Sequence, residues 1–151
     1  MKSEPEVYSI DDLRRDGSTG WDGVRNYQAR NFMRDEMADG ELVLFYHSNA
    51  NPSGVAGLAK VVGTSEPDPT QFDRKSEYFD ATSERAKPGW MRVRIAFIER
   101  FDEVVTLARL KAEKSLAGMP LLRPGQRLSV QPVEAPQFAH VLRLARARTV
   151  V

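Results

Sequence analysis

The sequence predicts an α+β domain in which a curved sheet or a small β-barrel is flanked by short helices. Two apolar runs of strand length, Leu42–Tyr46 and Val55–Val62, are separated by a segment rich in Asn, Pro and Gly. Over residues 91–97, apolar side chains alternate with Arg92 and Arg94, which is typical of a half-buried strand. Short amphipathic stretches precede and follow these strands, so helices and strands are mixed along the chain.

The composition indicates one globular domain that covers residues 1–151. Of the 151 residues, 41% are hydrophobic and 28% charged, and the chain contains neither an internal repeat nor a low-complexity linker. The absence of cysteine excludes disulfides, thiolate chemistry and cysteine-based zinc sites. No apolar stretch approaches the ~20 residues of a membrane span, and Met1–Pro5 lacks the apolar core of a signal peptide. We therefore expect a cytoplasmic protein without a membrane partner.

The first predicted elements are short. Val7–Ile10 predicts a strand, and Ser9 with Asp12 resembles a capping box that opens a brief helix. The Asp-Gly-Ser sequence at 16–18 then breaks this helix. A longer amphipathic helix is expected over Asn26–Ala38, because apolar side chains recur there at helical spacing, at Ala29, Phe32, Met33 and Met37.

Longer connections dominate the second half of the chain. Residues 49–54 predict a hairpin turn, and residues 64–89 form a long excursion of the kind that is usually functional in a compact domain. Thr106 caps a predicted helix through about Leu116, and residues 127–131 predict a short strand. A C-terminal helix is expected with a proline in its first turn and an apolar stripe, formed by Pro136, Phe138, Val141, Leu142 and Ala145.

The most informative segment is the run Gly20–Asn31. It places a tryptophan, a tyrosine, two arginines, two asparagines and a glutamine at the start of the predicted helix. A core segment would not carry so many hydrogen-bonding side chains, and a plain surface loop would not carry Trp21 and Tyr27 among them. The mixture suits a pocket that stacks a flat ligand and hydrogen-bonds its polar edge.

The formal net charge of +1 conceals an asymmetry. Residues 1–75 carry 9 Lys and Arg against 13 Asp and Glu, and residues 76–151 carry 13 against 8. Bulk charge alone would not attract this protein to nucleic acid, whereas a basic patch built from the second half would. The alternative is an ordinary solvated surface.

The chain lacks the residue patterns that most catalytic and metal sites require. Its two histidines, His47 and His140, do not have zinc-binding spacing, and there is no phosphate-binding glycine loop and no nucleophile elbow. His47 and Ser48 are adjacent on a predicted strand, so their side chains point to opposite faces and do not form a nucleophile–base pair. The sequence therefore predicts no catalytic residue, no bound metal and no cofactor.

Six segments in sequence order carry a resemblance to a known family. They are Lys2–Pro5, Trp21–Asn31, Phe45–Asn49, Gly54–Ala59, Asp68–Phe72 and Arg127–Pro132. Together they closely resemble the EVE domain family over about residues 2–145. The resemblance implies a PUA-like β-barrel fold, related to the YTH and ASCH domains.

The same resemblance implies a function. Family members are thought to bind nucleic acids, particularly modified bases, so we expect a non-enzymatic module that binds a methylated or hydroxymethylated base of DNA or RNA in an aromatic-walled pocket. Two alternatives stay open at this point. One is an RNA-binding module for unmodified nucleotides or for structure, and the other is an enzyme that acts on a nucleotide or modified base.

Three residues of the polar run have both a ligand-binding and a structural interpretation. Trp21 forms an aromatic wall for base stacking, or it belongs to the core. Asn26 hydrogen-bonds the base edge, or it caps the helix N-terminus. Arg25 contacts a phosphate, or it forms an ion pair with Asp22 that fixes the loop.

Further candidates are expected at the rim of the same pocket. His47 and Ser48 form the rim with Tyr46 beside them as a further wall, or they are a strand-terminal hydrogen-bonding pair. Lys2 and Ser3 would close the pocket from the N-terminal side.

The second half of the chain contributes the remaining candidates. A second aromatic wall is expected from Trp90 or Tyr78, the alternative for Trp90 being a place in the barrel core. Ser129 is expected to face the same cavity. Arg92 and Arg94 project from the polar face of their strand, where they contact the phosphate backbone or are simply solvated.

Overall fold

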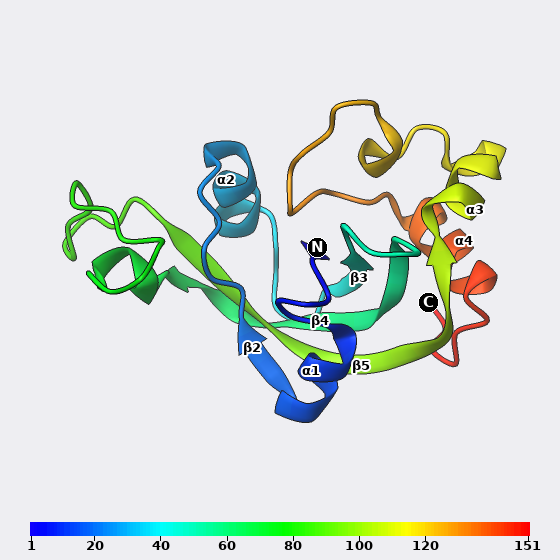
Figure 1. Ribbon diagram of the computed structural model, residues 1–151, viewed down its shortest axis with the longest axis horizontal. Helices are drawn as coiled ribbons and strands as arrows, with labels where there is room; N and C mark the ends of the chain where they lie inside the picture. Colours follow the sequence, from blue (N-terminus) through cyan, green and yellow to red (C-terminus); the bar gives the residue numbers. More distant parts are fainter.

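A computed structural model describes residues 1–151 and contains one mixed sheet of five strands (Figure 1). The spatial order of the strands is β1-β3-β4-β5-β2, with β1 parallel to β3 and every other pair antiparallel. The sheet is curved (Figure 1), as expected, but β1 and β2 lie at opposite edges and do not pair, so it is not closed into the small barrel that was the alternative expectation. The strands are β1 (Lys2–Ser3), β2 (Ser18–Gly20), β3 (Leu42–His47), β4 (Gly54–Pro67) and β5 (Met91–Thr106).

Four α-helices and three short 3-10 turns complete the fold. Side-chain caps begin three of the helices: Ser9 and Asp12 form the expected capping box, and Asn26 and Thr106 accept from backbone N–H groups of the first turn. The helices are α1 (Ile10–Asp16), α2 (Tyr27–Asp35), α3 (Leu107–Ala112) and α4 (Ala135–Leu144), and the 3-10 turns are η1 (Pro69–Phe72), η2 (Lys114–Leu116) and η3 (Pro120–Leu122).

The strands β4 and β5 are much longer than the sequence predicts and run the length of the molecule (Figure 1). Their pairing shifts register at three places, which bends the two-stranded ribbon. Gly57 permits one close approach, because a Cβ atom there would lie 2.5 Å from the carbonyl oxygen of Glu99. Residues 68–90, here called the β4–β5 loop, project beyond one end of the sheet, and α3 and α4 gather at the other end (Figure 1).

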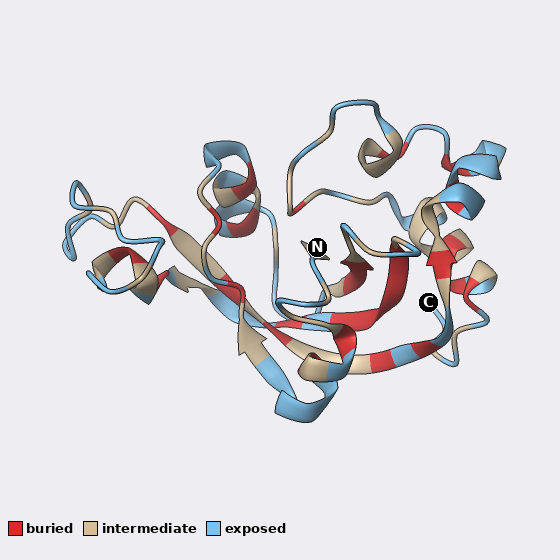
Figure 2. Ribbon diagram, viewed as in Figure 1, coloured by how far each residue is buried: buried red, intermediate tan, exposed pale blue.

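The core has two parts, one on each face of the sheet. Val43 and Phe45 of β3 pack in a cluster with α1 and α2, whereas Leu44 and Tyr46 pack in a cluster with α3 and α4. This explains why β3 is a continuous apolar run rather than an alternating one. Buried residues concentrate on the central strands, and the outer end of the β4–β5 loop is largely exposed (Figure 2).

Two predicted strands are wrong. Residues 7–10 do not form a strand, because the Glu4 carbonyl accepts from the N–H groups of Val7 and Tyr8 and the chain turns before α1. Residues 127–131 also form no strand. The side chains of Gln126 and Gln131 bond to nearby backbone there, which competes with ladder formation.

Candidate functional site

An open hollow of about 380 Å³ lies beside the N-terminal strand β1. We call it the N-terminal hollow. Five of the residues predicted from sequence to bind a ligand come together in its wall: Lys2, Ser3, Trp21, Tyr78 and Ser129. The other lining residues are Val7, Tyr8, Thr19, Gly20, Asp22, Gly23 and Val24.

The Trp21 side chain packs in the core and also lines the N-terminal hollow. It is 9% exposed and meets Phe45 edge-on, with ring centroids 5.7 Å apart, so it belongs to the α1–α2 cluster. Its indole N–H donates to no group of the protein. The only buried side-chain polar atom without a partner is Gln131 Oε1, so the Trp21 N–H is in contact with solvent. Trp21 therefore lines the hollow and carries a donor that no group of the protein uses.

The N-terminal side of the hollow is held by main-chain hydrogen bonds. The Lys2 N–H donates to the carbonyl of Ser129 at 2.8 Å, and the Ser48 N–H donates to the carbonyl of Ser3 at 2.9 Å. The Ser3 hydroxyl donates to the Tyr8 carbonyl at 2.7 Å. Burial lowers the pKa of the Lys2 ammonium.

Arg25 connects the segment after β2 to the β4–β5 loop. Its guanidinium donates to Asp68 Oδ2 at 3.0 Å, to Thr70 Oγ1 at 3.0 Å and to the carbonyl of Tyr78 at 2.8 Å. The ion-pair partner is thus Asp68 rather than the expected Asp22, which pairs with Arg92 instead. Arg25 therefore fixes the position of Tyr78, whose ring forms part of the hollow.

Asp68 is fully buried at this junction. Burial opposes its ionisation, but hydrogen bonds from Thr70, from the Gly23 N–H and from Arg25 outweigh burial and hold the pKa of the carboxyl below its ordinary value. One carboxylate thereby orients both walls of the hollow.

The comparisons with known proteins can now be set beside this geometry. The family model of the EVE domain matches residues 1–144. The chain belongs to the EVE domain family. Human thymocyte nuclear protein 1 is 42% identical to it over 95% of this chain and 72% of the human protein.

Solved structures of similar proteins have the same fold as this EVE domain. A protein of Pseudomonas syringae has a TM-score of 0.92 at 48% identity, covering 96% of this chain and 97% of that chain. The human THYN1 protein in complex with 5-methylcytosine-containing DNA has a TM-score of 0.89 at 41% identity, covering 99% of this chain and 97% of that chain.

Asn26, Tyr46, His47 and Ser48 of this EVE domain also lie outside the N-terminal hollow. The Asn26 side-chain oxygen accepts from the N–H groups at the start of α2, as in the helix-cap interpretation. His47 Nε2 accepts from the Ile10 N–H at 3.1 Å, which places the proton of the neutral ring on Nδ1. Burial lowers the pKa of His47, so the ring stays neutral. Tyr46 packs in the α3–α4 cluster, and Ser48 continues the chain beyond β3.

Trp90 lies neither in the hollow nor in either core cluster. Its indole N–H donates to Asp80 Oδ2 at 2.8 Å, and its ring stacks on Tyr27 with centroids 4.8 Å apart and planes 16° apart. Gln71 is fully buried and bonds to both the N–H and the carbonyl of Trp90. These contacts close the base of the β4–β5 loop.

The two candidate phosphate contacts have different surroundings. Arg92 forms ion pairs with Asp22 and with Glu66, each at 2.9 Å, and its side chain is 19% exposed. Arg94 makes one side-chain hydrogen bond, to Ser18 Oγ at 3.4 Å, and no ion pair. Arg94 therefore keeps more of its charge available to an anion.

The sequence analysis did not identify Gly23 as a residue that lines the hollow, although its backbone conformation and its contact with Tyr78 both require glycine. Its φ of +83° lies in the left-handed region that favours glycine, and a Cβ atom there would lie 2.7 Å from the Tyr78 ring. No group of three or more His, Cys, Asp or Glu residues is arranged to hold a metal ion. No helix is long and apolar enough to cross a membrane.

Proposed function

We propose that this EVE domain binds a modified base of DNA, of the 5-methylcytosine class, in the N-terminal hollow and leaves it chemically unchanged. The observation that carries the proposal is the similarity of fold and sequence, over 99% of the chain, to a THYN1 protein in complex with 5-methylcytosine-containing DNA. Hydroxymethylated bases belong to the same proposal. We also propose a cytoplasmic location, although the similar human protein is named as a nuclear protein.

The wall of the hollow supports recognition of a flat, partly apolar ligand. Tyr78 supplies an aromatic ring and Trp21 a second ring with an unused donor, while Lys2 and Ser129 add polar groups. Stacking on an aromatic side chain contributes about 1–3 kcal/mol per base. An apolar contact with one added methyl group contributes about 1 kcal/mol, which corresponds to about fivefold in affinity.

The titratable groups support binding rather than catalysis. His47, the one histidine considered as a general base, is not among the residues that line the hollow, and its Nε2 is occupied by the Ile10 N–H. Asp22 lines the hollow but is paired with Arg92. We therefore expect modified oligonucleotides to be recovered intact after long incubation, as checked by mass spectrometry.

Phosphate contacts from β5 are part of the proposal. Arg94 is the stronger candidate because it has no ion pair, whereas Arg92 would have to leave two carboxylates. Loss of one phosphate contact reduces the slope of log affinity against log salt by roughly one. Arg94→Ala is expected to show that reduction with methylated and unmethylated DNA alike.

The deciding experiment measures binding by fluorescence anisotropy at one stated salt concentration. The probes are a DNA duplex and its single strand, each with cytosine, 5-methylcytosine or 5-hydroxymethylcytosine at one position, and an RNA of the same sequence. We expect 5-methylcytosine to be preferred over cytosine by about fivefold. Equal affinity for all DNA probes would overturn the proposal, and tighter binding of unmodified RNA would favour the RNA alternative.

A pair of variants links that preference to the hollow. Tyr78→Ala removes the aromatic ring but keeps the carbonyl that Arg25 binds, so the loop stays anchored. Phe79→Ala is the matched control, since Phe79 is exposed to a similar extent and does not line the hollow. We expect the first variant alone to lower affinity.

A further inference from the structure

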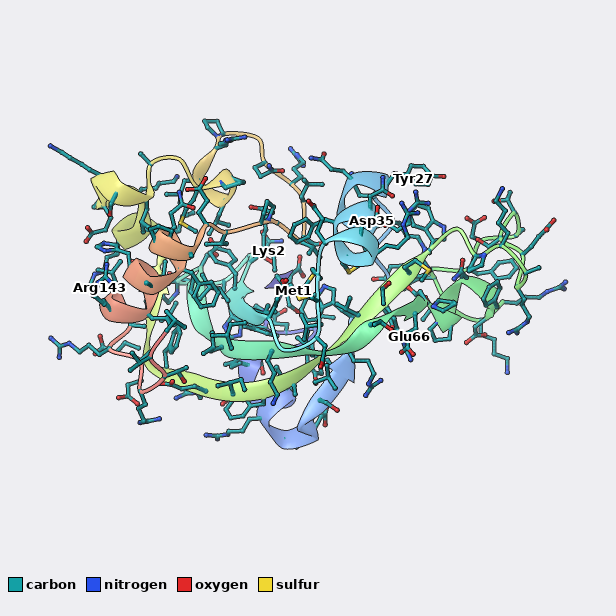
Figure 3. The ribbon with its side chains drawn as sticks, turned by 180° about the vertical axis from the view of Figure 1, so that it is seen from behind. Met1, Lys2, Tyr27, Asp35, Glu66 and Arg143 are labelled. Carbon is teal, nitrogen blue, oxygen red and sulfur yellow. The ribbon has the colours of Figure 1, made fainter.

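Tyr27 is an exposed aromatic side chain held on a rigid support. It is 63% exposed, yet one face of its ring stacks on Trp90, with the ring centroids 4.8 Å apart. Trp90 itself is fixed by Asp80 and Gln71, so the support does not move freely. Figure 3 shows Tyr27 at the outer surface of α2, on the side of the β4–β5 loop.

The outer face of the Tyr27 ring is open. The guanidinium carbon of Arg30 lies 4.7 Å from the Tyr27 ring centre and 5.8 Å from the Trp90 ring centre. With the rings 4.8 Å apart, these distances place Arg30 beside the stack rather than on the outer face. Arg30 donates to the Gly89 carbonyl and to Asn31 Oδ1 and makes no ion pair, so a positive charge without a carboxylate partner lies next to the open face.

The stack continues to the N-terminal hollow without a break. From the Tyr78 ring, which lines the hollow, the Arg25 guanidinium is 5.4 Å away, the Trp90 ring is 5.2 Å beyond it, and Tyr27 is 4.8 Å further. This span is only a few nucleotides long at about 3.4 Å per nucleotide of a stacked strand.

We propose that Tyr27 is a stacking platform for an unpaired base of the same DNA strand, a few nucleotides from the base in the hollow. An open aromatic face next to a cation matches the π-face and the phosphate of one nucleotide. A base within an intact duplex has both faces covered, so the platform selects single-stranded or locally opened DNA. This inference rests on the proposed function, because it takes the hollow as the site of the modified base.

The test combines variants with an abasic site moved along the oligonucleotide. Tyr27→Ala is expected to weaken single-stranded binding by about 5- to 100-fold, while Tyr27→Phe retains the affinity because it keeps the ring. When one base near the 5-methylcytosine is removed, the wild-type protein should bind the abasic probe more weakly than the intact probe. Tyr27→Ala should bind the two probes equally, because it has already lost the stacking contact. This non-additivity identifies the stacked base, since a variant that only damages the fold weakens every probe equally.

Val150→Ala is the control, because Val150 is an exposed apolar residue next to the C-terminus, away from α2 (Figure 1). The platform is overturned if Tyr27→Ala binds every probe like the wild type, or if its losses add to those of every abasic position. Either result leaves a 5-methylcytosine preference intact. Conversely, non-additivity at one position without any preference for the modified base would support the platform and overturn the proposed function.

Discussion

The two tryptophans belong to regions that burial alone does not distinguish. Trp21 is 9% exposed in the wall of the N-terminal hollow, and Trp90 is 7% exposed at the base of the β4–β5 loop. The Trp90 N–H is bonded to Asp80, and its ring is covered by Tyr27. The Trp21 N–H has no partner in the protein.

This difference teaches that two equally buried tryptophans can differ in the hydrogen-bonding capacity that they leave unused. Trp90 uses its polar atom to hold the loop, so nothing is left for a ligand. Trp21 is equally buried but leaves its donor in contact with solvent at an open hollow. Arg25 is similar to Trp90 in this respect, because every nitrogen of its guanidinium donates a hydrogen bond within the chain.

Replacing each tryptophan by alanine should separate the two regions by stability, with the largest expected effect. Trp21→Ala removes a ring from the α1–α2 cluster and should lower the free energy of unfolding by about 3–5 kcal/mol. Trp90→Ala lies outside both clusters and should mainly release the β4–β5 loop. Urea unfolding gives the first quantity, and limited proteolysis of residues 73–90 gives the second. If both variants lowered the global free energy of unfolding by the same amount, the two tryptophans would not differ in their structural role.

Replacement by phenylalanine should separate the regions by binding. Both changes keep one aromatic ring, make the side chain smaller and delete the N–H. Trp21→Phe should leave the protein folded, with a smaller loss of stability than Trp21→Ala, and should weaken binding of 5-methylcytosine DNA by about fivefold because a hydrogen bond to the ligand is lost. Trp90→Phe should keep the affinity but lower the unfolding midpoint, since Asp80 loses its donor. If the two variants exchanged these properties, the assignment of the hollow would fail.

Lowering the pH should change the surroundings of Trp90 but not those of Trp21. This is the smallest of the three effects predicted for the two tryptophans. Hydrogen bonds from Thr82 and from Trp90 lower the pKa of Asp80 from 3.8 to about 2. Since the folded pKa lies below the unfolded one, this stabilisation is present above about pH 3.8 and is lost as the pH falls through 2. Fluorescence of Trp90, read in Trp21→Phe, should change in that window, and Trp21, read in Trp90→Phe, should not. Asp80→Asn should abolish the step.

Features set by local sequence could be predicted. Helix starts depend on residues within one turn, and the caps at Ser9, Asn26 and Thr106 are found where their residue types indicate. β3 is also confirmed, because six successive residues without a turn former leave few alternatives. The polar run predicts a pocket with Trp21 in its wall, and Trp21 does lie in the wall of the N-terminal hollow. That a ligand binds there stays a prediction.

Features set by distant partners could not be predicted in this way. β2 exists because Ser18–Gly20 pairs with β5, almost eighty residues away, although its sequence is typical of a helix-ending turn. Arg25 has Asp22 as a sequence neighbour, but the fold brings Asp68 to it and gives Asp22 to Arg92. Periodicity and short motifs describe only nearby residues, so they do not predict contacts between residues far apart in the sequence.

The hydrogen bonds that close the β4–β5 loop at its base leave the exposed tip, residues 81–87, replaceable. Asp68, Gln71 and Trp90 form a fixed frame through buried hydrogen bonds, and Arg25 attaches that frame to the rest of the molecule. Beyond the frame, the carbonyl of Tyr78 is the one main-chain atom of the loop that Arg25 holds. A loop engineer could therefore lengthen, shorten or replace the exposed tip at residues 81–87 and keep the frame. Grafts that alter the frame would have to carry a matching residue at position 25.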